Sequence, residues 1–281
     1  MTKPLIRFKK FHYYLIPLIS LIVWWGMLIA LLAAWAAQGK PIYSFMSRYQ
    51  NPVYISDVAA TNLQPLFIAC SSFQAIFFVG TLVMGIYLRK KEKIQPYIST
   101  TQPKFAIASV VCAVIGQLGI IFTSIFNTNH FHTLHLTMVG IFIAFCFFAC
   151  CCDFVVSFKF GNNPDKLNPL HDGVKFGTWK WANLYMVSFF LKCVWLAAAF
   201  SFVICFGYFM GHMSRGLSAS FEWLIAFWYG LLLILWSMDL FPSALRHYRR
   251  KHPNVYQEKN NEPPLTSLGS EEATFVNSQD V

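Results

Sequence analysis

Long runs without charged side chains constrain this chain more than any other feature of its sequence. The longest extends from Phe105 to Cys152 and contains no Asp, Glu, Lys or Arg. A bilayer core about 30 Å thick is crossed by a helix of about 20 apolar residues. Charged residues make up 12% of the chain, whereas soluble domains contain about 25%. The sequence therefore predicts an all-α, polytopic membrane protein.

We expect six transmembrane helices, which form one membrane domain over residues 1–251. The run from Phe105 to Cys152 is too long for one crossing, and the polar residues 127–130 divide it. The first run is longer than the apolar core of about 7–15 residues in a signal peptide, so we expect a retained helix rather than a cleaved leader. The expected helices cover about 13–37, 64–88, 105–126, 133–157, 183–211 and 218–240.

The basic residues are distributed asymmetrically over the segments outside these helices. The N-terminus, the loops 89–104 and 158–182 and the C-terminal segment contain 18 of the 22 Lys and Arg residues. Because cytosolic segments of membrane proteins are enriched in Lys and Arg, we expect both termini in the cytosol. The net charge of +10 then lies on the cytosolic side. It points away from nucleic acid and toward the anionic lipids of the inner leaflet.

Two basic clusters directly adjoin expected helices on the cytosolic side. Clusters of about 4–8 basic residues in such positions bind anionic lipid. Enforcing the topology is the simpler interpretation, and the two roles are compatible. The polar residues 252–281 that follow the second cluster are expected to form a disordered cytosolic tail. The clusters are Arg89, Lys90, Lys91 and Lys93, and Arg246, Arg249, Arg250 and Lys251.

All eight cysteines fall within expected helices, so we expect no extracellular disulfide framework. Cys150, Cys151 and Cys152 lie near the cytosolic end of the fourth helix, where cysteines are sites of palmitoylation. Packing as small apolar side chains is the alternative interpretation, and we favour it.

Ionisable residues within the helices require a stabilising partner or a functional role, because a charge at the bilayer centre costs at least about 2.5–3.5 kcal/mol. Lys192 lies roughly 13 Å from the cytosolic end of the fifth helix. Its ammonium either snorkels toward the cytosol or pairs with Asp153 or Asp239, both near the cytosolic ends of their helices. We favour pairing, since snorkelling leaves the ammonium short of the headgroups.

Polar residues also gather at the expected outer ends of the helices. Glu222 begins the sixth helix, where the helix dipole favours an acid, and an inward-facing polar site is the alternative. His132 and His135 are three residues apart and share a helix face. A zinc site would need further ligands such as Asp57 or Glu222. We expect hydrogen bonding in a wet outer cavity instead, with no metal and no cofactor.

No complete catalytic motif is present, because the chain lacks a P-loop, a His-Glu-x-x-His motif and a Gly-x-Ser-x-Gly elbow. We therefore expect a protein that is not an enzyme. One alternative is acid–base chemistry on lipid at the outer face by His135, Asp57 and Glu222. A small transporter that uses Lys192 is another, although the internal repeats of many transporters are not evident.

The outer segment at residues 51–60 reads NPVYISDVAA, and Pro65-Leu66-Phe67 follows at the start of the second helix. Phe221-Glu222-Trp223 begins the sixth helix, which ends in Asp239-Leu240 before a basic stretch. These features resemble the Frag/DRAM/Sfk family of six-helix membrane proteins over residues from about 10 to 250. The residues that match the outer-face motifs are Tyr54, Ile55, Ser56, Asp57, His135, Glu222 and Trp223.

The resemblance implies a role in the lipid biology of a membrane. Sfk-type members are plasma-membrane proteins linked to recruitment of a phosphatidylinositol 4-kinase. DRAM-type members modulate autophagy at lysosomes, and Frag-type members assist remodelling of GPI anchors. The Phe-Glu-Trp sequence and the basic stretch favour the Sfk type. We therefore expect a plasma-membrane regulator or scaffold in phosphoinositide and phospholipid homeostasis, with anionic phosphoinositides and a lipid kinase complex as partners. The vacuole or lysosome and the ER or Golgi are the alternative locations.

Overall fold

The computed structural model describes residues 12–251 except 47–48, 169–170, 172–177 and 213. These residues form helices and loops and contain no strand, and six helices are long and apolar enough to cross a membrane. The predicted all-α, polytopic fold is thereby confirmed. The expected tail, 252–281, lies outside the described residues. The elements are α1 (Leu15–Ala37), α2 (Ile55–Ala59), α3 (Gln64–Lys90), α4 (Gln102–Ile125), α5 (His132–Asn162), η1 (Pro164–Lys166), α6 (Leu184–Gly211) and α7 (Arg215–Lys251).

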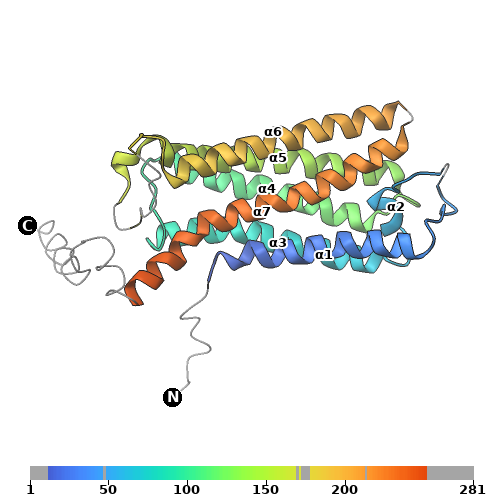
Figure 1. Cartoon of the computed structure of the whole chain (residues 1–281), viewed down its shortest axis with the longest axis horizontal. Helices are drawn as coiled ribbons and strands as arrows, with labels where there is room; N and C mark the ends of the chain where they lie inside the picture. Colours follow the sequence, from blue (N-terminus) through green and yellow to red (C-terminus); the bar gives the residue numbers. More distant parts are fainter. Residues whose placement is uncertain (1–11, 47–48, 169–170, 172–177, 213, 252–281) are drawn as a thin grey trace, which may run out of the picture.

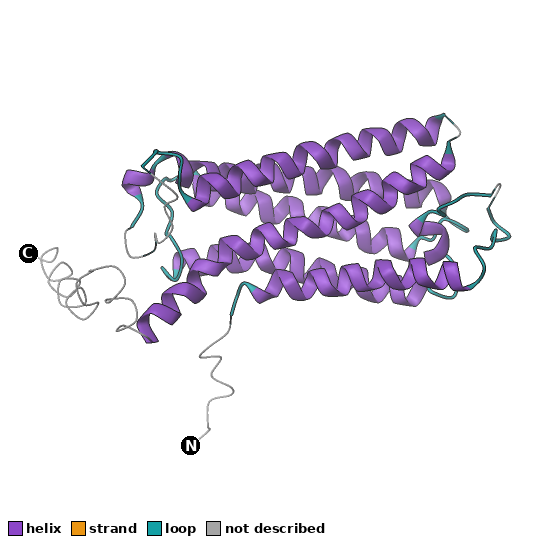
Figure 2. Ribbon diagram, viewed as in Figure 1, coloured by secondary structure: helices purple, strands orange, loops and turns teal. Residues whose placement is uncertain are grey.

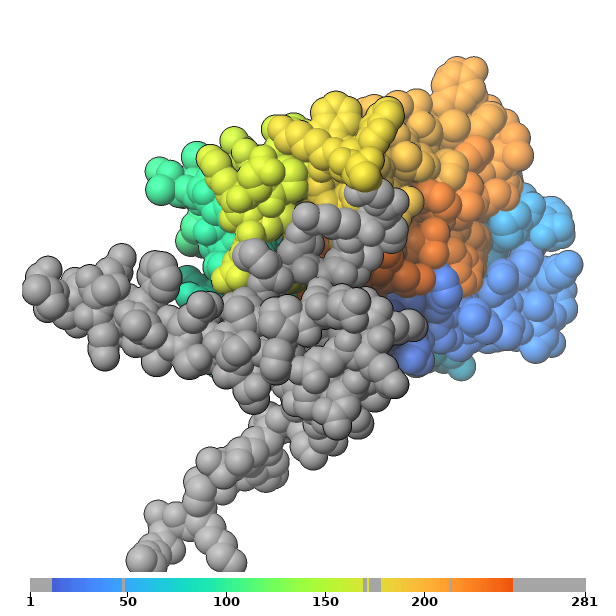
Figure 3. All heavy atoms as spheres, turned by 60° about the vertical axis from the view of Figure 1, so that its left-hand side comes forward, coloured from blue at the N-terminus to red at the C-terminus, as the bar shows by residue number. Residues whose placement is uncertain are grey.

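The long helices lie side by side in one elongated bundle (Figures 1 and 2). α1 begins, and α3 and α7 end, at the same end of this bundle. We call it the basic end, because residues 89–93 and 246–251 lie there, and we call the opposite end the α2 end. Figure 3 turns the basic end forward and shows the loops that follow α3 and α5 on its surface. Which end faces the cytosol remains a prediction from the distribution of Lys and Arg.

Two helices continue well past their expected ends, and one short helix was not expected. α5 continues to Asn162, and α7 continues through Pro242 to Lys251. The short helix α2 lies in a segment expected to be an outer loop. Hydropathy locates the part of a helix that crosses the bilayer, which for α7 we expected at residues 218–240. It does not locate the helix end, because backbone hydrogen bonds within a helix form in water as well.

α4 and α5 approach each other closely because α4 carries a glycine at their contact. A Cβ atom at Gly119 would lie 2.8 Å from the backbone nitrogen of Phe142. Nearby, Ser109 Oγ of α4 donates a hydrogen bond to the Ala149 carbonyl of α5 at 2.8 Å. Small residues that let backbones approach are typical of helix contacts in membranes. This pair forms one side of the bundle and carries His135 at the α2 end.

Indole side chains hold α7 against its two neighbours. Trp24 Nε1 of α1 donates to the Ala226 carbonyl at 2.8 Å. Trp195 of α6 and Trp228 of α7 each donate to the other's carbonyl, at 2.8 and 3.0 Å. A buried indole N–H needs such an acceptor. These contacts position α7, which contributes a carboxylate to the candidate site at each end of the bundle.

Candidate functional site

The two sequence motifs of the outer face meet at the α2 end. The Glu222 carboxylate accepts a hydrogen bond from the N–H of Ile55 at 2.7 Å. Trp223 Nε1 donates to the Val53 carbonyl at 2.7 Å. The Ile55 N–H lies in the first turn of α2, where it has no acceptor within the helix. The start of α7 therefore holds the start of α2, and the two motifs form one structural unit.

Asp57 lies on α2 in a buried position beside this unit, with 8% of its surface exposed. Burial raises the pKa of the Asp57 carboxyl to about 6, although the positive charge of Arg215 opposes the shift. The carboxylate of Glu222 also faces Asp57. Asp57 therefore titrates closer to neutral pH than an exposed aspartate.

A cavity of about 640 Å³ opens beneath α2 inside the bundle. Asp57, Glu222, Arg215 and His135 line its polar part. Its volume falls within the range of about 300–1,000 Å³ that is usual for small-molecule sites. The remaining wall is largely apolar and includes Phe142, Phe147, Phe200, Val203 and Leu232. The polar residues that the sequence placed at the outer ends of the helices thus line the mouth of an apolar chamber.

The two histidines are held by local hydrogen bonds. His135 is buried, and its Nδ1 lies 2.8 Å from the Phe126 carbonyl and 3.0 Å from the Thr123 carbonyl. His132 Nδ1 lies 3.1 Å from Thr128 Oγ1. Among the described residues, no three His, Cys, Asp or Glu side chains are grouped as metal ligands. His135 thus closes the turn between α4 and α5 while it lines the cavity.

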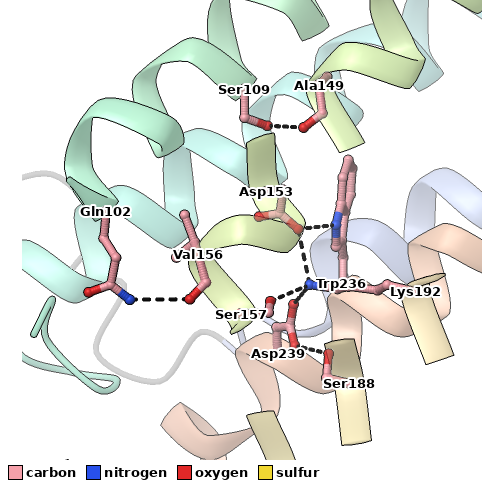
Figure 4. A network of polar contacts seen from close by, with 10 residues as sticks. All are labelled: Gln102, Ser109, Ala149, Asp153, Val156, Ser157, Ser188, Lys192, Trp236 and Asp239. Atoms are coloured by element: carbon pink, nitrogen blue, oxygen red, sulfur yellow. Dashed lines mark hydrogen bonds and ion pairs between the residues drawn. The ribbon is translucent and has the colours of Figure 1, made fainter. Parts of the chain in front are cut away.

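Lys192 lies fully buried between three helices near the basic end (Figure 4). Its ammonium donates to Asp153 Oδ2 of α5 at 3.0 Å and to Asp239 Oδ2 of α7 at 2.5 Å. The third donor reaches Ser157 Oγ at 2.9 Å. The sequence offered the two aspartates as alternative partners, and the structure brings both to the lysine. All three N–H groups of the ammonium are satisfied.

Each of the two carboxylates in this network also accepts a hydrogen bond from a neutral donor. Trp236 Nε1 donates to Asp153 Oδ2 at 3.0 Å, and Ser188 Oγ donates to Asp239 Oδ1 at 2.7 Å (Figure 4). A small cavity of about 50 Å³ lies beside both aspartates and is also lined by Arg89. Buried charges persist when such hydrogen bonds complete their coordination. The network therefore ties α5, α6 and α7 together.

A neutral network at the bundle centre was not predicted. Tyr229 OH of α7 accepts from Gln74 Nε2 of α3 at 2.5 Å and from Gln117 Nε2 of α4 at 3.0 Å. Tyr229 also lines the large cavity. The signal that could have found this network is the pair of amides within otherwise apolar runs, since each needs a partner in the membrane.

The first basic cluster divides into a structural arginine and exposed lysines. Arg89 donates from Nη1 to the Gln95 carbonyl at 2.8 Å, and its guanidinium lies 4.5 Å from the centre of the Phe160 ring. Arg89 therefore organises the loop after α3. The side chains that reach the surface are Lys90, Lys91 and Lys93.

The cysteine run of α5 has one buried and two partly exposed members. Cys150 is 1% exposed and lines the large cavity, which fits the packing interpretation. Cys151 and Cys152 are partly exposed, and all eight cysteines of the chain are free. Acylation of Cys151 and Cys152 remains a prediction.

The family model of the Frag1/DRAM/Sfk1/Cwh43P N-terminal domain matches residues 12–243. The chain belongs to this family. Protein SFK1 of Saccharomyces cerevisiae is 34% identical to it over 278 residues, which cover 81% of this chain and 78% of that protein. Protein sfk1 of Schizosaccharomyces pombe is 25% identical over 237 residues, which cover 84% of this chain and 66% of that protein. No solved structure shows significant similarity to the chain. In this member of the Frag1/DRAM/Sfk1 family, the motif residues 54–57 and Glu222 line the large cavity, and Trp223 is bonded to the Val53 carbonyl just before the first motif.

Proposed function

We propose that this protein is a non-enzymatic regulator of phosphoinositide and phospholipid homeostasis at the plasma membrane. In this role it supports the recruitment of a phosphatidylinositol 4-kinase. Two relatives named Sfk1 support the Sfk type over the DRAM and Frag types of the family. The structural observation that carries the proposal is the continuous helix of α7 at the basic end.

α7 presents the second basic cluster on a helical element at the expected membrane border. The uncharged stretch that follows Asp239 ends at Leu245, and the helix itself continues for six further residues to Lys251. These residues extend it by about 9 Å, at about 1.5 Å each. The basic residues 246–251 lie on these last turns. In the predicted topology, this stretch of α7 adjoins the cytosolic leaflet together with the exposed lysines at the end of α3.

This arrangement favours lipids with several negative charges over those with one. Each basic residue close to an anionic leaflet contributes about 1 kcal/mol of attraction, which falls off within a Debye length. A phosphoinositide headgroup interacts with several such residues at once. We infer that the basic end concentrates phosphoinositides, so that a lipid kinase and its substrate meet beside the protein.

The test is a charge-neutralised protein with Arg246→Gln, Arg249→Gln, Arg250→Gln and Lys251→Gln. We expect the plasma-membrane pool of phosphatidylinositol 4-phosphate, followed with a fluorescent lipid-binding reporter, to decrease while the protein remains abundant and inserted. A matched control removes the same number of charges at the same end of the bundle, through Lys104→Gln, Lys159→Gln, Lys166→Gln and Lys180→Gln. The control variant is expected to leave the plasma-membrane pool of phosphatidylinositol 4-phosphate unchanged. An unchanged pool in the first variant would overturn the proposal.

A further inference from the structure

We propose that the large cavity binds one lipid from the surrounding membrane, with its hydrocarbon chain inside the bundle and a hydrogen-bond-donating headgroup at the α2 end. The headgroup carries a hydroxyl or an amine and no net negative charge. This ligand site lies at the end of the bundle opposite the basic end, so it stands independently of the proposed function.

The cavity has the shape of a chain rather than of a compact metabolite. On α5 its lining residues extend from His132 to Cys150, and on α6 from Trp195 to Met210. At about 1.5 Å per residue these stretches are about 27 and 22 Å long. A volume of about 640 Å³ spread over this length describes a long, narrow chamber parallel to the helices. An extended acyl chain matches it, because acyl chains in a bilayer run along the same direction.

The wall of the chamber becomes apolar below its mouth. The lower part is lined by side chains that offer no hydrogen bonds to a water-soluble ligand, such as Phe142, Phe147, Leu196, Val203 and Leu232. Burial of hydrocarbon against such a wall is favourable, whereas burial of an unpaired polar group is costly. The wall therefore selects a hydrocarbon chain.

The mouth of the chamber carries two acidic side chains and one basic one. Asp57 and Glu222 supply two carboxyl groups, and Arg215 supplies one cation. Gln50 and Thr123 line the same cavity and are 4% and 3% exposed. Gln50 Oε1 and Thr123 Oγ1 have no hydrogen-bond partner among the described residues. Buried polar atoms are normally paired. A headgroup that donates hydrogen bonds pairs with these oxygen atoms, whereas a negatively charged headgroup is repelled by the two carboxyl groups.

A lipid can reach the chamber from the side, between α5 and α6. Phe148 of α5 and Phe200 of α6 both line the cavity, and they are 53% and 54% exposed. α6 is also the least buried spanning helix, with 11% of its apolar window buried against 28–39% in the others. A single layer of side chains thus separates the chamber from the bilayer on this side. Rotation of such side chains is fast in exposed positions.

The experiment uses the full chain, purified in detergent and reconstituted into nanodiscs, with photoactivatable lipids of three kinds. The probes are a diacylglycerol with a free hydroxyl, a phosphatidylethanolamine and a phosphatidic acid, each with a diazirine at the end of one acyl chain. Crosslinked peptides are identified by mass spectrometry. We expect the hydroxyl or the amine probe to label residues near Cys150 and Leu232, at the closed end of the chamber. The ratio of labelling by these two probes identifies the preferred headgroup. Phosphatidic acid should label these residues about tenfold less, because two carboxyl groups line the mouth.

A plug variant and a matched control test occupancy directly. Ala199 of α6 lines the cavity, whereas Ala197 of the same helix is exposed and does not line it. Ala199→Trp should reduce labelling of the closed end about tenfold or more, because the indole fills the space of the chain, and Ala197→Trp should not. Equal labelling of the two variants would overturn the proposal, as would labelling of the wild type confined to exposed residues. The position of labelling in the wild-type protein decides the question even if Ala199→Trp fails to fold.

Discussion

At the scale of single residues, Lys192 is a fully buried cation that needs hydrogen-bond partners inside the bundle. Its side chain is 0% exposed, and it bonds carboxylates from two other helices. The sequence could predict a charged partner for Lys192, because an unpaired ammonium is too costly at that depth. It could not predict that both aspartates bind it. That outcome depends on how α5 and α7 rotate about their axes, which is set by packing of the whole bundle.

Removal of the lysine should destabilise the fold. Lys192→Met leaves two carboxylates without their cation, and loss of one partner from a buried ion pair costs about 3–5 kcal/mol. We expect a lower midpoint of thermal unfolding in detergent. Addition of Asp153→Asn and Asp239→Asn should restore part of the loss, because the remaining groups are then neutral. Lys180→Met, at an exposed position, is the control, and a midpoint equal to that of the control would contradict the network's structural role.

Asp57 should make stability depend on pH. Its folded-state pKa of about 6 lies above the ordinary value of 3.8, so the folded state holds a proton that the unfolded chain has released. Protonation of Asp57 therefore adds to the free energy of unfolding. This stabilisation is fully present below about pH 4 and is lost as pH rises to about 6, and it amounts to about 1.4 kcal/mol for each unit of pKa difference.

The measurement is thermal unfolding in detergent between about pH 4 and 7. Asp57→Asn should flatten the decline of the midpoint over this range. Asp165→Asn, at an exposed acid, should leave the decline intact. If the unfolding midpoint declines equally with pH in the wild type and in Asp57→Asn, then Asp57 is not the source of the pH dependence.

At the scale of elements, the spanning helices could be predicted because an uncharged run of sufficient length has few alternatives in a membrane protein. α2 could not be predicted in the same way. It has five residues, too few for a periodic pattern, and its first N–H is satisfied by Glu222, 167 residues away in sequence. The Tyr229 network was missed for a related reason, since its amides are on α3 and α4 and its hydroxyl is on α7.

The contact between α4 and α5 provides a prediction at this scale. Gly119→Leu places a side chain where even a Cβ atom would lie 2.8 Å from the backbone of α5. The helices must then separate, and overpacking of this kind costs about 1–3 kcal/mol or more. We expect reduced abundance and a lower unfolding midpoint. Gly140→Leu is the matched control on α5, because a Cβ there meets nothing within 4 Å, and equal behaviour of the two variants would refute the close contact.

At the scale of the whole molecule, the bundle has two ends of different chemistry. The α2 end carries buried carboxyl groups at the mouth of an apolar chamber, and the basic end carries clustered cations on α3 and α7. The proposal for the basic end depends on one further claim, that this end faces the cytosol.

Accessibility of introduced cysteines tests that claim most directly. Asn62 at the α2 end and Thr100 at the basic end are both exposed and uncharged, and the eight native cysteines lie in the spanning helices. We predict that a membrane-impermeant maleimide labels Asn62→Cys in intact cells, and labels Thr100→Cys only after the plasma membrane is permeabilised. The parent protein measures the background. Labelling of Thr100→Cys in intact cells, with Asn62→Cys protected until permeabilisation, would contradict the account.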